Sequence, residues 1–320
     1  MSVKRIVQAL KKHNTFIISA HIDLEGDALG SEIALGYLLK AMKKKVYIIN
    51  NDPTPAEYAF LPGKAMFAKR KELPSAAVFI AVDCSDLKRL GRVAQIADTA
   101  KLVINIDHHM SNERFADINW VDAKASSASE MVFKLFKALR RPLSKDAALA
   151  LYTGIATDTG WFKYSNTTAA THAMVVELVK QGIDSYKIYR HIYQNFSIRA
   201  IQHIGTILNA IEVDSSGGIA WVTLREGSGM RSVPGGISDI VFGFLRSIAG
   251  IEVAIIFRQK KKKLTKVNLR SQSRVNVGAF AQKFGGGGHS RASGFVYPAS
   301  LAVTKSHIVA QLKKKVYAKA

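Results

Sequence analysis

Residues 102–109 read Leu-Val-Ile-Asn-Ile-Asp-His-His, and this stretch decides the fold that the sequence predicts. Mostly apolar, β-branched residues lead directly into one acid and two imidazoles. This is typical of a buried strand that ends at a polar site. In an open α/β sheet the carboxyl ends of the strands face the ligand crevice. We therefore expect Asp107, His108 and His109 to lie at a metal or substrate site.

Other segments before and after this strand have the same character. Apolar runs predict three more strands, at residues 15–20, 46–50 and 78–82, and helical spacing follows the first of them over 28–42. His21 follows the first strand and Asp83 follows the third, so three of the four strands end at a metal-capable residue. Strands separated by helices predict an α/β fold with a doubly wound, mainly parallel sheet.

The rest of the chain predicts a second, smaller α/β domain. Helices are expected at 128–139, after a capping box formed by Ser127 and Glu130, and at 145–157 and 168–181. After residue 214 the pattern changes to strands at 219–224, 251–258 and 264–270, with a helix at 238–249. We expect a catalytic domain over 1–190, a helical connector over 191–212 and a substrate-binding domain over 213–320.

The composition indicates a folded protein in a reducing setting. Of the 320 residues, 48% are hydrophobic, and no apolar run has the length of a membrane span. The N-terminus carries no secretory pattern, and the one cysteine, Cys84, excludes an intrachain disulfide, so we expect a cytoplasmic protein. Cys84 follows Asp83 at a strand end, where a catalytic thiol is one interpretation and a small packing residue is the other.

The formal net charge of +22 predicts attraction to polyanions such as nucleic acids, nucleotides or an anionic membrane. The alternative is a bias toward lysine on solvated helix faces. Four consecutive lysines, residues 260–263, fall in a predicted tight turn. They either form a solvated hairpin tip that blunts a sheet edge or contact nucleic acid.

Eight polar residues at strand and helix ends carry the predicted chemistry. They are five carboxylates and three imidazoles: His21, Glu25, Asp27, Asp83, Asp107, His108, His109 and Asp158. Such a group would repel itself or take up protons unless a cation neutralised it. Mixed histidine and carboxylate ligands suit Mn²⁺, Zn²⁺ or Fe²⁺. The set is large enough for two ions about 3.5–4 Å apart that share a carboxylate, an arrangement used in phosphoester hydrolysis.

In this order the motifs resemble those of the DHH phosphoesterase family, and within it the DHH/DHHA1 branch, over nearly the whole chain. The first motif is seen at residues 21–31, followed by Asp83, by Asp107-His108-His109 and by Asp158-Thr159-Gly160. The C-terminal signature of four glycines and a histidine stands at 285–289, with Ala-Ser-Gly at 292–294.

The resemblance implies a role for each residue. One metal would be held by His21, Glu25 and Asp83, and the other by Asp27, Asp83, His108 and Asp158. Asp83 would bridge two divalent ions, for which Mn²⁺ is the expected identity. Asp107 would orient an imidazole and His109 would face the phosphate, so that Asp83, Asp107 and His109 are the catalytic set. The family usually has Asp where this chain has Glu25, which predicts a weaker first metal site or one with a different ion preference.

In the second domain, four consecutive glycines offer exposed backbone amides that could cradle a phosphate, although a plain flexible loop is the alternative. The resemblance implies that this domain grips the nucleotide and closes over the metals. The expected substrate-binding residues are Arg270, Ser271, Gly287, Gly288, His289 and Arg291.

The resemblance points to the bifunctional oligoribonuclease (nano-RNase) and pAp phosphatase type. Such an enzyme hydrolyses short RNA or DNA oligonucleotides to mononucleotides and 3′-phosphoadenosine 5′-phosphate (pAp) to AMP. The alternatives are hydrolysis of linear or cyclic dinucleotides, an inorganic pyrophosphatase of the same fold, and a basic nucleic-acid-binding protein with a structural metal. The sequence leaves open whether the chain forms a homodimer.

Overall fold

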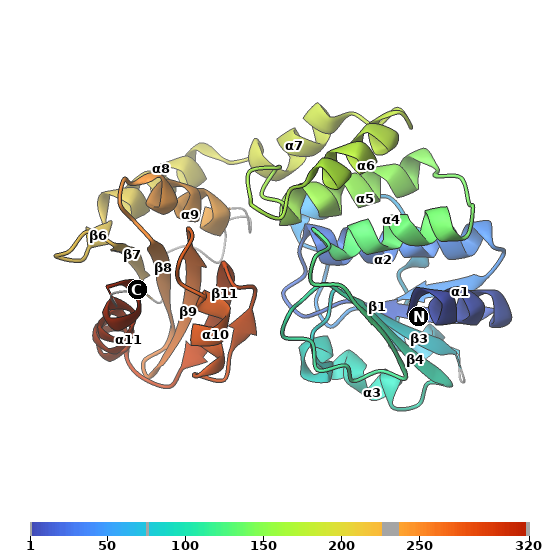
Figure 1. Ribbon diagram of the computed structural model, residues 1–320, viewed down its shortest axis with the longest axis horizontal. Helices are drawn as coiled ribbons and strands as arrows, with labels where there is room; N and C mark the ends of the chain where they lie inside the picture. The colour runs from blue at the N-terminus through green and yellow to red at the C-terminus, as the bar shows by residue number, and fades with distance from the viewer. Residues whose placement is uncertain (1, 75–76, 226–236, 318–320) are drawn as a thin grey trace. The chain divides into compact units, whose positions relative to one another are not determined.

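The computed structural model of the chain describes residues 2–74, 77–225 and 237–317 (Figure 1). It divides into an N-terminal unit, Met1–Ile192, and a C-terminal unit, Tyr193–Ala320. In the described residues the first unit contains a parallel sheet and the second a mixed sheet, each packed with helices. This confirms the predicted α/β class with a smaller second α/β domain. No helix among the described residues is long and apolar enough to cross a membrane.

The sheet of the N-terminal unit has the order β2-β1-β3-β4-β5, and all its described pairs are parallel. The strands are β1 (Thr15–Ser19), β2 (Lys45–Ile48), β3 (Val78–Val82), β4 (Leu102–Asp107) and β5 (Ile118–Val121). The first four coincide with the predicted strands to within one or two residues. The sequence reading missed β5, because a four-residue strand that is buried only at alternate positions has little apolar signal.

Helices cover this sheet, and α2 lies at the centre of the unit. The helices are α1 (Ser2–Lys12), α2 (Gly26–Ala41), α3 (Ala94–Ala97), α4 (Ala128–Ala138), α5 (Lys145–Asp158), α6 (Ala169–Val179) and α7 (Ser185–Tyr193), with short 3₁₀ turns η1 (Ala56–Tyr58), η2 (Lys64–Met66), η3 (Arg70–Glu72) and η4 (Leu87–Val93). Almost every residue of α2 is buried, as expected of a helix that is apolar on all sides. It begins two residues earlier than predicted, which brings Asp27 into its first turn.

Two glycines allow α2 and α5 to pack with their backbones almost in contact. A Cβ atom on Gly30 in α2 would lie 2.5 Å from the carbonyl oxygen of Ala150 and 3.1 Å from the Cα atom of Gly154, both in α5. Only glycine fits at such distances. This close packing brings the start of α2 and the end of α5, where Asp27 and Asp158 stand, to the same side of the sheet.

The capping box predicted for α4 is only half formed. The Glu130 N–H donates to Ser127 Oγ at 3.0 Å, as expected. The Glu130 carboxylate, however, accepts from the N–H and hydroxyl of Ser126, one residue earlier than predicted. The prediction was wrong about this second bond. One oxygen of the Glu130 carboxylate accepts from Ser126 and the other lies 2.8 Å from the Lys134 ammonium.

The C-terminal unit has a mixed sheet in the order β10-β11-β9-β8-β7-β6, in which β7 and β8 pair in parallel and the other described pairs are antiparallel. The strands are β6 (Glu212–Val213), β7 (Ile219–Leu224), β8 (Val253–Lys261), β9 (Leu264–Ser271), β10 (Gly287–Gly288) and β11 (Ala292–Tyr297). The helices are α8 (Ile198–Asn209), α9 (Ile237–Ser247), α10 (Val277–Gln282) and α11 (Leu301–Val316). One apolar cluster joins α8 and α9 to the sheet, and a second joins α10 and α11 to it.

Two details of this unit differ from the sequence reading. The four lysines at 260–263 do lie at an exposed hairpin tip, but β8 and β9 are interior strands, so the tip does not blunt a sheet edge. The glycine run is not a plain loop, because Gly287 and Gly288 pair with β11. A Cβ atom on Gly288 would lie 2.4 Å from the Ala292 carbonyl oxygen, so the backbones meet too closely for any other residue.

Candidate metal centre and catalytic site

The candidate site lies where the order of the parallel sheet reverses. From β1 the chain moves to β2 on one side and then to β3 on the other side, so β1 and β3 flank the switch point. Open α/β sheets bind ligands outside the carboxyl ends of strands at such a point. His21 stands two residues after β1 and Asp83 directly after β3. Asp83 has φ of +52°, a left-handed conformation that is uncommon for residues other than glycine and often found at functional sites.

His21, Glu25 and Asp83 form a first group of candidate ligands, with one ligand atom from each within 4.8 Å of the others. His21 Nε2 lies 3.3 Å from Asp83 Oδ2 and 3.9 Å from Glu25 Oε1. The other ring nitrogen, Nδ1, donates to the Ile22 carbonyl at 2.6 Å. This bond fixes the ring so that Nε2 faces the carboxylates, an orientation that metal-binding histidines commonly have.

A second group is formed by Asp27, Asp83 and His108. His108 Nε2 lies 3.4 Å from Asp83 Oδ1, 3.8 Å from Asp27 Oδ2 and 3.5 Å from Asp158 Oδ2. His108 Nδ1 lies 3.3 Å from the carbonyl oxygen of Ala125, so Nε2 again faces the acids. Each oxygen of Asp83 therefore faces a different group, which is the arrangement of a shared ligand.

The surroundings of the Asp83 carboxylate fit a metal site. Both of its oxygens are buried, and neither has a hydrogen-bond donor among the described residues. A buried carboxylate needs compensation by positive charge or hydrogen bonds. Divalent cations would provide that compensation, and the histidine and carboxylate donors around Asp83 suit Mn²⁺, Zn²⁺ or Fe²⁺.

The pKa values of the acids show that the site needs positive charge. Burial, together with the charge of Asp83, raises the pKa of Asp27 to about 7, and burial raises the pKa of Asp158 well above its ordinary value. Burial would also raise the pKa of Asp83, but the imidazoles of His108 and His21 outweigh it and hold that pKa well below its ordinary value. For His21 itself, Asp83 and Glu25 outweigh burial and raise the pKa to about 10.

Asp107 binds the ring of His109. Its Oδ1 accepts from His109 Nδ1 at 2.7 Å, and its Oδ2 accepts from Asn112 Nδ2 at 2.6 Å. Asn112 also donates to Asn105 Oδ1 at 2.8 Å, and Asn105 in turn donates to the Cys84 carbonyl. The sequence reading missed both asparagines. Asn105 carried a signal, because it is the one polar residue inside the apolar run that forms β4.

The start of α4 holds Asp27. The N–H groups of Ala128 and Ser129 donate to its two oxygens at 2.6 and 2.8 Å. The positive end of a helix dipole stabilises a carboxylate at this position. The sequence carried no signal for these bonds, because they join residues that are 101 and 102 positions apart.

A buried acid behind the site, Glu32, was also missed. Its Oε1 accepts from Asn50 Nδ2 at 2.7 Å, and Asn50 Oδ1 accepts from the N–H of Ala20 at 3.1 Å, next to His21. Burial raises the pKa of Glu32 to about 8. The signal was a single acid within an otherwise apolar stretch of α2. Through Asn50, Glu32 helps to hold the turn that carries His21.

Cys84 lies in the core rather than in the site. It is fully buried, and its Sγ is 3.1 Å from the Asp86 carbonyl. Burial raises the pKa of the thiol, which disfavours the nucleophilic thiolate form. The packing interpretation of this residue is the one that the structure supports.

The expected substrate-binding residues come together within the C-terminal unit. Arg270 and Ser271 end β9 beside the turn that joins β10 to β11, since Arg270 pairs with Ala292 and the Ser271 N–H donates to the Arg291 carbonyl at 3.0 Å. Gly287 and Gly288 form β10, and His289 begins the turn. The Arg270 guanidinium lies over the Phe242 ring at 4.8 Å.

Glu252, which the sequence did not point to, stabilises the loop after Ser271 by accepting hydrogen bonds from it. One carboxylate oxygen accepts from the N–H groups of Ser273, Arg274 and Val275 at 3.2, 2.6 and 2.8 Å. The other accepts from the Ser273 hydroxyl at 2.9 Å. Burial would raise the pKa of Glu252, but these donors outweigh it and hold the pKa below its ordinary value.

Comparisons with known proteins show which domains the chain contains and which proteins it is similar to. The model of the DHH family, N-terminal domain, matches residues 15–155, and that of the DHHA1 domain matches residues 227–316. The chain is 32% identical over 278 residues (87% of this chain, 82% of the relative) to the bifunctional oligoribonuclease and PAP phosphatase NrnA of Thermus thermophilus. It is 25% identical to the Bacillus subtilis protein of the same name, with 90% of this chain and 91% of the relative covered. The crystal structure of an exopolyphosphatase-related protein from Bacteroides fragilis superposes with a TM-score of 0.87 at 26% identity, covering 98% of this chain and 96% of that one.

Proposed function

Because the chain belongs to the DHH family of phosphoesterases and carries a DHHA1 domain, we propose that it uses two Mn²⁺ ions to hydrolyse short oligonucleotides to mononucleotides and pAp to AMP. The observation that carries this proposal is the buried Asp83 carboxylate, whose two oxygens face two separate groups of ligands. The names of the relatives in Thermus thermophilus and Bacillus subtilis support the choice of substrates.

In this proposal His21, Glu25 and Asp83 hold one ion, and Asp27, Asp83, His108 and Asp158 hold the other. When bound, the ions would supply Lewis acidity and lower the pKa of a bound water toward neutrality. The protein's part is to fix the positions of the ligands. The Ile22 carbonyl orients His21, and the start of α4 orients Asp27.

His109 and Asp107 are the proposed catalytic pair beside Asp83. His109 donates from Nδ1 to Asp107, and this bond orients the ring. The Nε2 side of the ring is the proposed contact for a phosphoryl oxygen on which negative charge builds up. Asn112 keeps Asp107 in place through the other carboxylate oxygen.

The C-terminal unit is the proposed substrate grip, with residues 1–190 as the catalytic domain, 191–212 as the connector and 213–320 as the grip. The planar guanidinium of Arg270 suits a phosphate, since it can donate two parallel hydrogen bonds. Arg291, Ser271, His289, Gly287 and Gly288 are proposed to complete the grip around the phosphate and sugar.

The test is a panel of substrates with the purified protein in Mn²⁺. We expect release of phosphate from pAp and of mononucleotides from a diribonucleotide. The variant Asp83→Asn should lower both rates about a thousandfold, because the loss of shared metal ligation removes several kcal/mol of transition-state stabilisation. Asp98→Asn, at an exposed carboxylate between α3 and the amino end of β4, whereas the site lies at the carboxyl ends of the strands, should leave both rates unchanged. Absence of both activities in the wild type, or an unimpaired Asp83→Asn variant, would overturn the proposal.

A further inference from the structure

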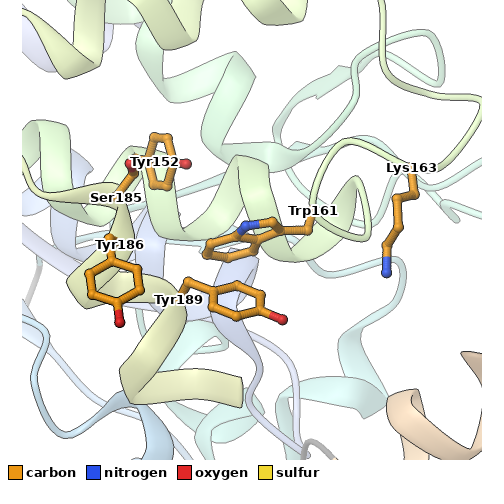
Figure 2. A pocket seen from close by; sticks show the side chains of 6 residues that line it. All are labelled: Tyr152, Trp161, Lys163, Ser185, Tyr186 and Tyr189. Carbon is orange, nitrogen blue, oxygen red and sulfur yellow. The ribbon is translucent and has the colours of Figure 1, made fainter. Parts of the chain in front are cut away.

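The N-terminal unit contains an aromatic pocket that the mechanism above does not use. Its volume is about 460 Å³, and it is lined by Tyr152, Trp161, Lys163, Ser185, Tyr186 and Tyr189 (Figure 2). This volume lies in the range of about 300–1,000 Å³ that is usual for small-molecule sites. Figure 2 shows the Trp161 indole at the centre of these side chains, with Lys163 separate at one side.

The rings of this pocket suit a flat aromatic ligand. The centroid of the Trp161 ring lies 5.1 Å from that of Tyr189 and 6.0 Å from that of Tyr152. Trp161 and Tyr189 are both partly exposed, so each keeps part of a ring available for a ligand. Nucleobases stack on such rings regardless of sequence, and the nearby Lys163 ammonium would favour a ligand that carries phosphate.

The backbone that carries Trp161 is strained and firmly held. Gly160, Trp161 and Phe162 have φ of +56°, +61° and +66°, although left-handed conformations are unfavourable for bulky residues. The Trp161 N–H donates to the Ala156 carbonyl at 2.6 Å, and the Phe162 N–H donates to Thr159 Oγ1 at 3.1 Å. Strain that the surroundings hold in place is typical of functional sites.

The pocket is close to the proposed metal ligands, and its residues belong to a different unit from those of the proposed nucleotide grip. Trp161 follows the ligand Asp158 by three residues, so their Cα atoms are at most about 11 Å apart. The residues proposed to grip the terminal nucleotide belong to the C-terminal unit, whereas the pocket belongs to the catalytic unit. A base bound in the pocket would therefore be a second base, attached through the phosphate at the metals.

We propose that this pocket binds the nucleobase of the second nucleotide of a dinucleotide or oligonucleotide substrate, an inference that rests on the proposed function. Since pAp has only one base, the pocket would contribute to oligonucleotide hydrolysis and not to pAp hydrolysis. It is thus the feature that separates the two activities.

The test compares the two substrates in two variants, Trp161→Ala and Tyr189→Ala. Each should raise the KM for a diribonucleotide about tenfold, which is the effect of losing one base–aromatic stack, and leave pAp kinetics within about twofold. Trp161→Phe is the matched control that keeps an aromatic ring, and it should recover most of the loss. Equal losses on both substrates, or an unchanged diribonucleotide KM in both alanine variants, would overturn the inference.

A binding measurement separates this inference from the proposed function. A dinucleoside methylphosphonate resists cleavage and should change the tryptophan fluorescence of the wild-type protein in Mn²⁺. The change should vanish in Trp161→Phe although Trp120 and Trp221 remain. If pAp is not hydrolysed while this signal is present, the proposed function fails and the base site stands. If the signal persists in Trp161→Phe, the base site fails.

Discussion

Replacing the buried Glu32 by Gln should stabilise the protein, and increasingly so as the pH rises. Glu32 is fully buried, and its Oε2 has no hydrogen-bond partner within the described part of the chain. Its pKa is raised from 4.5 to about 8, so between these values the folded state holds a proton that the unfolded state has released. Holding that proton costs free energy that grows with pH.

The size of the effect follows from this interval. An acid that is protonated only in the folded state lowers the free energy of unfolding by about 1.4 kcal/mol for each pH unit. Between pH 5.5 and pH 7.5, both inside this interval, the free energy of unfolding of Glu32→Gln should therefore rise by about 2–3 kcal/mol relative to that of the wild type. Gln keeps the carbonyl oxygen that accepts from Asn50, so the two proteins should have similar stability near pH 4.5.

Urea unfolding at several pH values, with Mn²⁺ held constant, measures the difference between the two proteins. Subtracting the curves removes the contribution of the other titrating groups, including Asp27, because they are common to both proteins. A difference that does not change with pH would mean that Glu32 ionises normally in the folded state, and the reasoning from its burial would be refuted. Unchanged pAp kinetics in the variant would show that the turn carrying His21 keeps its position.

Four further predictions concern the site and its supports. Asp107→Asn should lower kcat about 10²–10⁴-fold with little change in KM, because an amide cannot accept from both Asn112 and His109 as the carboxylate does, so the His109 ring would lose its orientation; unchanged steady-state kinetics would contradict this. Glu25→Asp should tighten Mn²⁺ binding measured by calorimetry, and weaker binding would show that the longer side chain fits the site. Glu252→Gln should lower the free energy of unfolding about 1–3 kcal/mol at pH 7 and less as the pH falls through the lowered pKa of Glu252; the same loss at pH 7 and pH 3 would refute this. Chelation of the metal should lower the melting temperature followed by circular dichroism, and an unchanged temperature would argue against compensation of the buried acids by ions.

The sequence predicted features that depend on short-range pattern. The apolar runs before His21, Asp83 and Asp107 are long enough to identify strands, and their shared parallel direction is enough to gather the polar ends at one edge. Short strands escaped this reasoning, because β5 and β10 have four and two residues and leave little periodic signal.

Features that depend on long-range contact could not be predicted from one sequence. The hydrogen bonds from the start of α4 to Asp27 and from the Ala20 N–H to Asn50 can be predicted only if one knows which elements lie side by side. The same is true of Glu252, whose partners stand 21 to 23 positions further along the chain. For each of them the sequence showed at most a polar residue in an apolar setting, which marks a position as unusual without identifying its partner.

The near contact between the backbones of α2 and α5 has a consequence for the choice of ion. Because Gly30 leaves no room for adjustment against Ala150, Asp27 and Asp158 are carried on what is effectively a single rigid body. If Asp27 and Asp158 bind the same ion, an ion of larger radius could move their carboxylates apart only by separating the two helices. Asp27 and Asp158 would then discriminate between ions by ionic radius. The exposed Glu25, which precedes α2, would accept ions of a wider range of radii.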